Sequence, residues 1–217
     1  MGSPRDYGQF CGLAAGLNVI GNRWTLLIIR ELLLGPVRFN DLVANLPGIG
    51  SNLLAERLQG LAAAGVIEVV PVAGDRRGKS YQLTERGQEL KGPLLLLARW
   101  GLSALTEQDS KGVVRAEWAI IALEAMVTDD SIPTLDEAYE FVIDGVPVVV
   151  TVQDGVVSIG RGAPVADVAL RVTSDAETFV RVGARLIDPL EAVAQGLVKL
   201  EGDMVAADRC IRLLNLA

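Results

Sequence analysis

Histidine is absent from this 217-residue sequence, and cysteine occurs only as Cys11 and Cys210. Histidine is the usual general base, a common zinc ligand and the middle member of the Ser-His-Asp arrangement, so its absence disfavours common hydrolase and zinc chemistries. Two cysteines are too few for a zinc site within one chain or for a disulfide framework. We therefore predict a protein that is not an enzyme, with no catalytic residues, no metal and no cofactor.

Long apolar runs are also missing, because no segment approaches the roughly 18 uninterrupted apolar residues of a membrane span. Residues 1–6 lack the basic and then apolar pattern of a secretory signal, so we expect a cytoplasmic protein with no membrane partner. Half of the residues are nevertheless apolar, which is enough for two cores. A polar run at residues 107–112 predicts a boundary between domains at 1–108 and 113–217.

The net charge of −7 argues at first against nucleic acid, but the acidity belongs to one half of the chain. Residues 1–110 hold 11 Lys and Arg against 10 Asp and Glu, a net charge of +1. Residues 111–217 therefore hold 9 against 17, a net charge of −8. A local basic patch that binds a polyanion is thus compatible with the first half.

Four helices are predicted in the first half from the helical spacing of apolar side chains. They span residues 10–20, 24–34, 39–46 and 51–64, and the second is apolar nearly all round, as in a core helix. The third ends at Pro47-Gly48, and Ser51 is predicted to cap the fourth. Two short helices joined by such a turn can place the second in a DNA major groove, although helical hairpins are also common as plain structure.

A hairpin with a basic tip follows these helices. Residues 66–70 and 79–83 read as antiparallel strands, and the segment between them carries Arg76 and Arg77, with Lys79 just beyond. This cluster can grip phosphates or enter a minor groove, and a solvated turn is the alternative. Thr84 is predicted to cap a helix through Leu105, interrupted at Gly92-Pro93, whose apolar surface favours a homodimer.

Several separated blocks of the first half carry a family resemblance. They are CGL at 11–13, the run from Leu17 to Leu32, GPVRFNDL at 35–42, PGI at 47–49, LLAERL at 53–58, AGVI at 64–67 and YQLTERG at 81–87. In this order they resemble the HxlR family of bacterial winged-helix regulators. The resemblance covers about residues 8–107. It implies a dimeric repressor or activator whose helix from Ser51 enters the major groove of double-stranded DNA, while the wing with Arg76 and Arg77 touches the flanking backbone.

The helices, the hairpin and the resemblance together give the candidate DNA-binding residues Arg38, Asn40, Ser51, Asn52, Glu56, Arg57, Arg76, Arg77 and Lys79. Ser51 is equally suited to be only a cap, and Glu56 with Arg57 to form a surface pair. Family members often respond to electrophiles or oxidants through a cysteine near the N-terminus, which makes Cys11 the candidate thiol sensor. The family commonly has Cys-Pro there, where this chain has Cys11-Gly12, and sensing needs an exposed thiolate rather than a buried thiol.

The second half predicts a sheet covered by helices. A helical face at residues 118–125 precedes strands at 139–143, 146–152, 156–159, 166–172 and 197–200, with turns at Asp144-Gly145 and Asp154-Gly155. Ser174-Asp175-Ala176-Glu177 reads as a capping box that opens a helix, and a closing helix is predicted at 203–214. The predicted fold class is α+β: a winged helix-turn-helix domain plus an α/β domain with a five-stranded, largely antiparallel sheet covered by helices.

This order resembles the sterol-carrier-protein type 2 fold over residues 113–217, through the hairpin at 141–159, the helix after Ser174 and the GLVKLEGD segment at 196–203. The resemblance implies a space between sheet and helices for a lipid or another small apolar effector, and ordinary core is the alternative. The leading hypothesis is a homodimeric DNA-binding transcription regulator that an apolar ligand or thiol modification modulates. The alternative is a carrier of lipid or small apolar molecules that uses the winged helix as a protein-interaction module.

Overall fold

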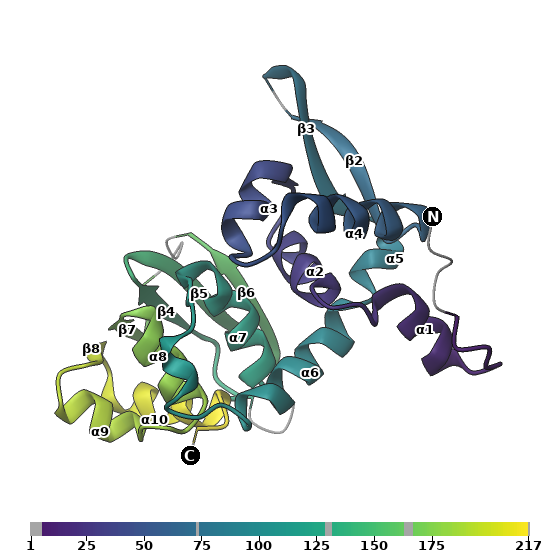
Figure 1. Cartoon of the computed structure of the whole chain (residues 1–217). Coiled ribbons are helices and arrows are strands. Elements are labelled where there is room, and N and C mark those ends of the chain that lie inside the picture. The colour runs from purple at the N-terminus through teal and green to yellow at the C-terminus, as the bar shows by residue number, and fades with distance from the viewer. Residues whose placement is uncertain (1–5, 73, 129–131, 163–166, 217) are drawn as a thin grey trace. The chain divides into compact units, whose positions relative to one another are not determined.

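The computed structural model describes residues 6–72, 74–128, 132–162 and 167–216, and divides the chain into two compact units, Met1–Leu94 and Leu95–Ala217 (Figure 1). Each unit has its own sheet and its own buried side chains. The predicted domain boundary at residues 107–112 stays a prediction. No single described helix is long and apolar enough to cross a bilayer. The helices α1 (Gly12–Ile20) and α2 (Thr25–Leu33) are long and apolar enough only when taken together, and the chain bends by 80° between them.

The first unit packs helices against a three-stranded sheet, as in a winged helix-turn-helix domain. Its further elements are β1 (Val37–Arg38), α3 (Phe39–Asn45), α4 (Ser51–Ala63), β2 (Ile67–Val72), β3 (Asp75–Leu83) and α5 (Glu85–Gln88), and α6 (Lys91–Leu102) crosses the division between the units. Ile28, Leu42 and Leu54, from three successive helices, have no exposed surface. The apolar spacing that predicts these helices therefore marks their buried faces, and the predicted fold of this unit is confirmed.

The start of α4 differs from the prediction by one residue. Gly50 is the N-cap residue, with an extended backbone, and Ser51 is already the first residue of the helix. Ile49 is buried, and its anchored side chain fixes the preceding turn so that Gly50 reaches the cap position. The prediction that Ser51 caps this helix is therefore wrong, and its side chain is exposed on the first turn.

The wing is the hairpin of β2 and β3, and the strand order β1-β3-β2 is antiparallel throughout. It is longer than predicted, because β3 begins at Asp75 and not near Lys79. Gly74 makes the turn with a φ of +78°, and the ladder continues through a register shift after Pro71 to pair Val72 with Asp75. The backbone of Arg76 and Arg77 therefore lies in a strand, which corrects the predicted loop.

Thr84 caps α5 as predicted, because its hydroxyl oxygen accepts the backbone N–H of Gly87 at 3.1 Å. The predicted helix from Thr84 through Leu105 is wrong in its break and in its end. The break falls between Gln88 and Lys91, and α6 ends at Leu102. Gly92-Pro93 does not interrupt α6, because a proline in the first helical turn has no intrahelical N–H bond to lose.

The second unit is built around one five-stranded sheet. Its elements after α6 are η1 (Asp109–Lys111), η2 (Ala116–Trp118), α7 (Ala119–Met126), β4 (Glu137–Ile143), β5 (Val146–Gln153), β6 (Val156–Arg161), β7 (Leu170–Ser174), α8 (Ala176–Gly183), α9 (Pro189–Ala194), β8 (Lys199–Gly202) and α10 (Met204–Leu213). The strand order is β6-β5-β4-β7-β8, and only the pair β4 and β7 is parallel among the described strands. The predicted largely antiparallel sheet is confirmed.

Two tight turns connect the first three strands of this sheet. Asp144 and Gly145 have φ values of 47° and 78°, and Asp154 and Gly155 have values of 51° and 74°. Positive φ at both central residues defines a type I′ turn, which matches the twist of a hairpin and favours the Asp-Gly dipeptide. Both predicted hairpins are therefore present.

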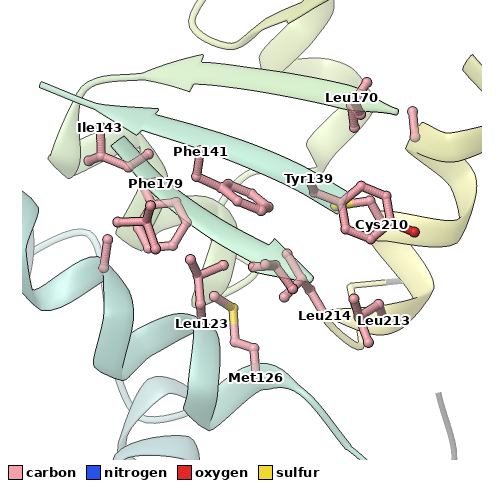
Figure 2. Packing of buried hydrophobic residues seen from close by; sticks show 14 of the residues in the cluster. Leu123, Met126, Tyr139, Phe141, Ile143, Leu170, Phe179, Cys210, Leu213 and Leu214 are labelled. Atoms are coloured by element: carbon pink, nitrogen blue, oxygen red, sulfur yellow. The ribbon is translucent and has the colours of Figure 1, made fainter. Parts of the chain in front are cut away.

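The core of the second unit lies between one face of the sheet and helices α7, α8 and α10 (Figure 2). The inward side chains Tyr139, Phe141 and Ile143 alternate along β4, and Leu123 and Phe179 meet them from the helices. The ring of Phe141 lies edge to face with that of Phe179, with centroids 6.3 Å apart. The period-two pattern in the sequence thus identifies the inward face of β4.

The capping box predicted at Ser174 is wrong by one position. Asp175 is the N-cap of α8, and its side chain accepts the backbone N–H of Thr178 at 2.7 Å. Ser174 is still part of β7, where it pairs with Ile143 and is buried. The strand is shifted from its predicted range, because it begins at Leu170; residue 166 lies outside the described residues.

Candidate nucleic-acid interface and interior cavity

Helix α4 presents one apolar face and one polar face. Leu54 and Leu58 are buried in the first unit, whereas Ser51, Asn52 and Glu56 are exposed on the other side of the helix. A hydroxyl, an amide and a carboxylate are the groups that read base edges in a major groove. The predicted helix of the helix-turn-helix pair therefore has its polar reading side in solvent.

Arg57 on α4 is already engaged within the first unit. Its guanidinium donates to a carboxylate oxygen of Glu56 at 2.7 Å and reaches the backbone carbonyl of Arg23 at 3.5 Å. The Arg57 side chain is 19% exposed, compared with 69% for Glu56. The surface pair that the sequence left open is therefore present, and a phosphate contact by Arg57 requires it to leave Glu56.

Arg38 and Asn40 lie at the start of α3, where β1 brings the chain beside the wing. Arg38 pairs with Ser80 of β3 in the sheet register, and its guanidinium lies 3.4 Å from a carboxylate oxygen of Asp75. Both side chains of this ion pair are about half exposed, so water screens the pair. Asn40 is exposed in the first turn of α3. A polar strip thus leads from α3 to the root of the wing.

The wing carries Lys79 as an exposed cation on β3. The side chains of Arg76 and Arg77 lie outside the described part of the structure, and their DNA-binding role stays a prediction. The Asp75 carboxylate accepts the backbone N–H of Gly78 at 2.9 Å and holds the end of the hairpin together. This carboxylate reduces the positive potential at the base of the tip.

The two cysteines are in opposite environments. Cys11 is exposed at the N-cap position of α1, where the backbone N–H groups of Ala14 and Leu13 lower the pKa of its thiol. Cys210 on α10 is buried, and this burial raises the pKa of its thiol to about 12. Cys11 is therefore exposed and has a lowered thiol pKa, whereas Cys210 is buried and has a raised one.

An ion pair with a buried carboxylate and a guanidinium that is 27% exposed was not predicted in the second unit. Arg209 of α10 donates to both carboxylate oxygens of Glu137 at 2.8 and 2.6 Å, and the Tyr139 hydroxyl donates to the same carboxylate. Burial opposes ionisation of Glu137, but these donors outweigh it, and the pKa of Glu137 lies below its ordinary value. The signal in the sequence is a glutamate at an inward position of β4, two residues before Tyr139.

A cavity of about 320 Å³ lies in the second unit, between the sheet and helices α8, α9 and α10. Most of its wall is apolar, and it includes Phe141, Phe179 and Met126, whose side chains are labelled in Figure 2. The sequence could not predict this cavity, because the pattern of inward-facing apolar residues is the same whether their side chains pack together or leave a space between them. Within the described ranges, no three His, Cys, Asp or Glu side chains gather as metal ligands would.

The exposed face of α6 is apolar. Leu96 and Trp100 are 64% and 70% exposed, and Leu97 is also exposed. Side chains of this size are seldom left together in water on a helix unless another surface covers them.

Two family models match the chain in succession. Residues 19–109 match the HxlR-like helix-turn-helix family, and residues 120–215 match the SCP-2 sterol transfer family. Curated relatives match the first segment. An uncharacterized HTH-type transcriptional regulator of Mycobacterium tuberculosis is 40% identical over 99 residues, 46% of this chain and 61% of the relative. This chain therefore spans less than two thirds of that relative's length.

Shorter relatives are covered more fully. An uncharacterized HTH-type transcriptional regulator of Synechocystis sp. is 33% identical over 107 residues, 48% of this chain and 77% of the relative. The regulator YodB of Bacillus subtilis is 31% identical over 88 residues, 41% of this chain and 79% of the relative. Among solved structures, the oxidized form of the redox regulator HypR is 28% identical, with a TM-score of 0.42 over 44% of this chain and 99% of that chain. On these sequence matches the chain belongs to the HxlR-like helix-turn-helix family, and its residues 120–215 match the SCP-2 sterol transfer family.

Proposed function

We propose that this chain is a homodimeric, DNA-binding transcription regulator in which α4 enters the major groove and the β2–β3 wing contacts the flanking backbone. The observation that carries the proposal is the exposed polar side of α4, with Ser51, Asn52 and Glu56, on a helix whose other side is buried. The regulator names of the relatives agree with this role, and the proposal assigns no catalytic step to the chain.

The phosphate contacts are assigned to Arg38, Lys79, Arg76 and Arg77, with Arg57 after release from Glu56. Arg38 and Lys79 are exposed beside or on the wing, so they can meet the backbone next to the groove that α4 occupies. Contacts of this kind supply position and salt-dependent affinity, whereas Asn52 and Ser51 at the helix start supply base discrimination.

A dimer is proposed because two copies of a DNA-binding domain match two half-sites about 34 Å apart. Dimerisation is assigned to α6, because its exposed face is apolar. The cavity of the second unit is assigned to an apolar effector, and Cys11 to thiol modification. Either input regulates DNA binding if it favours one of two dimer geometries over the other.

A gel shift on the DNA upstream of the chain's own gene tests the proposal. We expect specific retention of the wild-type protein and loss of most of it in Arg76→Ala/Arg77→Ala. The slope of log affinity against log salt for residual binding becomes shallower by about 1 for each lost phosphate contact. Arg161→Ala/Arg212→Ala in the second unit removes the same charge and is the matched control.

Base reading is tested on the same DNA with Asn52→Ala. We expect a loss of preference for the operator over unrelated duplex, with the salt slope unchanged, because no phosphate contact is removed. Equal retention of all variants, or no sequence preference in the wild type on any upstream fragment, would contradict the proposal.

The interior cavity favours a second candidate function, carriage of a lipid or small apolar molecule with the winged helix as a protein-interaction module. This alternative predicts that an apolar molecule copurifies with the chain and that no DNA is retained selectively. Extraction of the purified protein followed by mass spectrometry, beside the gel shift, separates the two functions.

A further inference from the structure

The charged groups that line the cavity of the second unit are of one sign. Asp188, at the start of α9, and Asp208, on α10, are the acidic residues among its described lining, and no lysine or arginine is among them. A carboxylate or phosphate ligand in this space would therefore lack a cationic partner in the wall. A bound cation would have two anionic partners, Asp188 and Asp208.

Both carboxylates remain accessible to a ligand despite their present contacts. One oxygen of Asp188 accepts the N–H groups of Leu190 and Glu191 as the cap of α9, and its side chain is exposed. Asp208 pairs with Arg212 at 2.9 Å, but these side chains are 60% and 68% exposed, so water screens the pair. Both groups remain able to attract a cation at the edge of the cavity.

The apolar wall suits the apolar part of such a ligand. Phe141 and Phe179, which are labelled in Figure 2, both line the cavity, and their ring centroids are 6.3 Å apart. Aromatic rings offer an apolar chain a large contact area. The Cys210 thiol in the same wall has its pKa raised to about 12 by burial, so at neutral pH it stays an uncharged apolar group.

The size and edge of the cavity limit its occupant. Its volume of about 320 Å³ is near the lower end of small-molecule sites, about 300–1,000 Å³. Leu190 and Met204 line it and are 65% and 62% exposed, so the cavity is continuous with an apolar edge on α9 and α10. An occupant with a short apolar chain and one charged end fits both the dry wall and the acidic edge.

We propose that this cavity binds a small amphipathic organic cation, with its apolar part against Phe141 and Phe179 and its charge beside Asp188 and Asp208. The inference rests on the proposed function, in which this cavity is the effector site. It adds the class of that effector: a molecule with a short apolar chain and one cationic end.

Isothermal titration calorimetry with three probes of equal chain length tests the charge preference on the full chain. The probes are octyltrimethylammonium, octyl sulfate and 1-octanol, each below its micelle concentration. We expect octyltrimethylammonium to bind at least about tenfold more tightly than octyl sulfate, with 1-octanol between them, since two partly exposed carboxylates each contribute a modest factor.

Two variants locate the effect. Asp188→Asn/Asp208→Asn removes both charges while asparagine keeps the α9 cap, and we expect the cation and the sulfate to bind within about threefold of each other. Glu177→Gln/Glu191→Gln removes two exposed charges from α8 and α9 outside the cavity lining and should keep the full preference. Val193→Phe fills part of the cavity and should abolish binding of all three probes.

Equal or tighter binding of octyl sulfate overturns the proposal, as does a preference that the control pair loses as much as the aspartate pair. Saturable binding that survives Val193→Phe, in a variant with unchanged near-ultraviolet circular dichroism, places the probes elsewhere and also overturns it. None of these readouts involves DNA. Failure here therefore leaves the gel shift standing, and failure of the gel shift leaves the probe titration standing.

Discussion

The two units of the chain carry opposite charge and present their chemistry in different places. Met1–Leu94 holds 10 basic and 8 acidic residues, and Leu95–Ala217 holds 10 and 19, so the net charges are +2 and −9. In the first unit the distinctive groups are outside: the polar side of α4, the wing and the Cys11 thiol. In the second they are inside or at an edge: the Glu137–Arg209 pair, the Cys210 thiol and the cavity.

This difference separates two kinds of recognition. A surface that reads a polyanion needs exposed donors and little net negative charge, because long-range attraction begins before contact. A cavity selects by shape and by a few polar groups, and the acidity of the surrounding unit does not interfere. The net charge of −7 for the whole chain therefore hides the difference between a first unit suited to DNA and a second unit suited to a cation.

The largest contrast is expected between the two thiols. Iodoacetamide should modify Cys11 at least about 1,000-fold faster than Cys210. Cys210 is buried, so the reagent can reach it only when the second unit opens. Because the thiolate reacts and the pKa of Cys11 is lowered, its rate should rise with pH and level off at a lower pH than the rate of an ordinary exposed thiol.

Peptide mass spectrometry over time measures both rates, and Cys11→Ser is the control that leaves only the slow reaction. In urea the two thiols should react alike. Comparable rates in native protein would remove the contrast between an outward and an inward cysteine.

The next largest effect is expected at the pair of Arg209 with the buried Glu137 carboxylate. Arg209→Met should lower the free energy of unfolding of the second unit by about 3 kcal/mol, because the Glu137 carboxylate stays buried without its bidentate partner. The pKa of Glu137 is lower in the folded state, so the wild-type pair stabilises above about pH 4.3, and this contribution is lost as the pH falls through the folded pKa. The difference between wild type and variant should therefore shrink in acid.

Urea unfolding followed by circular dichroism at pH 7 and at pH 3 measures this difference. Arg212→Met is the matched control, because its pair with Asp208 is exposed and should cost under about 1 kcal/mol. An equal loss in both variants would show that the burial of Glu137 has no energetic consequence.

The smallest of the three effects compares one glycine in each unit. A Cβ at Gly87 would lie 2.1 Å from the backbone carbonyl oxygen of Val66, and one at Gly202 would lie 2.4 Å from that of Ala169. Those oxygens accept hydrogen bonds in the fold, so the backbone cannot yield freely. We expect Gly87→Ala and Gly202→Ala each to destabilise by about 2 kcal/mol.

The two glycine variants should act on different readouts. Gly87→Ala should weaken DNA retention, and Gly202→Ala should weaken probe binding in the cavity. Gly60→Ala and Gly160→Ala, where an added Cβ meets nothing within 4 Å, are the controls. Loss of both readouts in each variant would argue against two separable units.

Short-range chemistry made much of this fold predictable from the sequence. The turns at Asp144-Gly145 and Asp154-Gly155 and the cap at Thr84 depend on adjacent residues, and all three are present. The caps at Ser51 and Ser174 were placed wrongly by one residue. In each case the position depends on where a buried neighbour or a strand register fixes the chain, which the local pattern does not contain.

The site was predictable as a surface but not as a set of contacts. The exposed side of α4 follows from helical spacing, whereas the pairing of Arg57 with Glu56 and Arg23 depends on packing across the first unit. Glu137 and Arg209 are 72 residues apart, and the aspartates at the cavity come from two different helices. Contacts of such sequence separation carry no local signal.

The parallel pairing of β4 with β7 has a consequence for biosynthesis. Tyr139 lies beside Leu170, so the middle of the second sheet cannot close until the ribosome has delivered the segment between them and β7 itself. The β2–β3 hairpin of the first unit closes over a short turn as it emerges. Non-local strand pairing is slow to form. On the nascent chain the first unit can therefore be folded while the edge of β4 that pairs with β7 is still exposed.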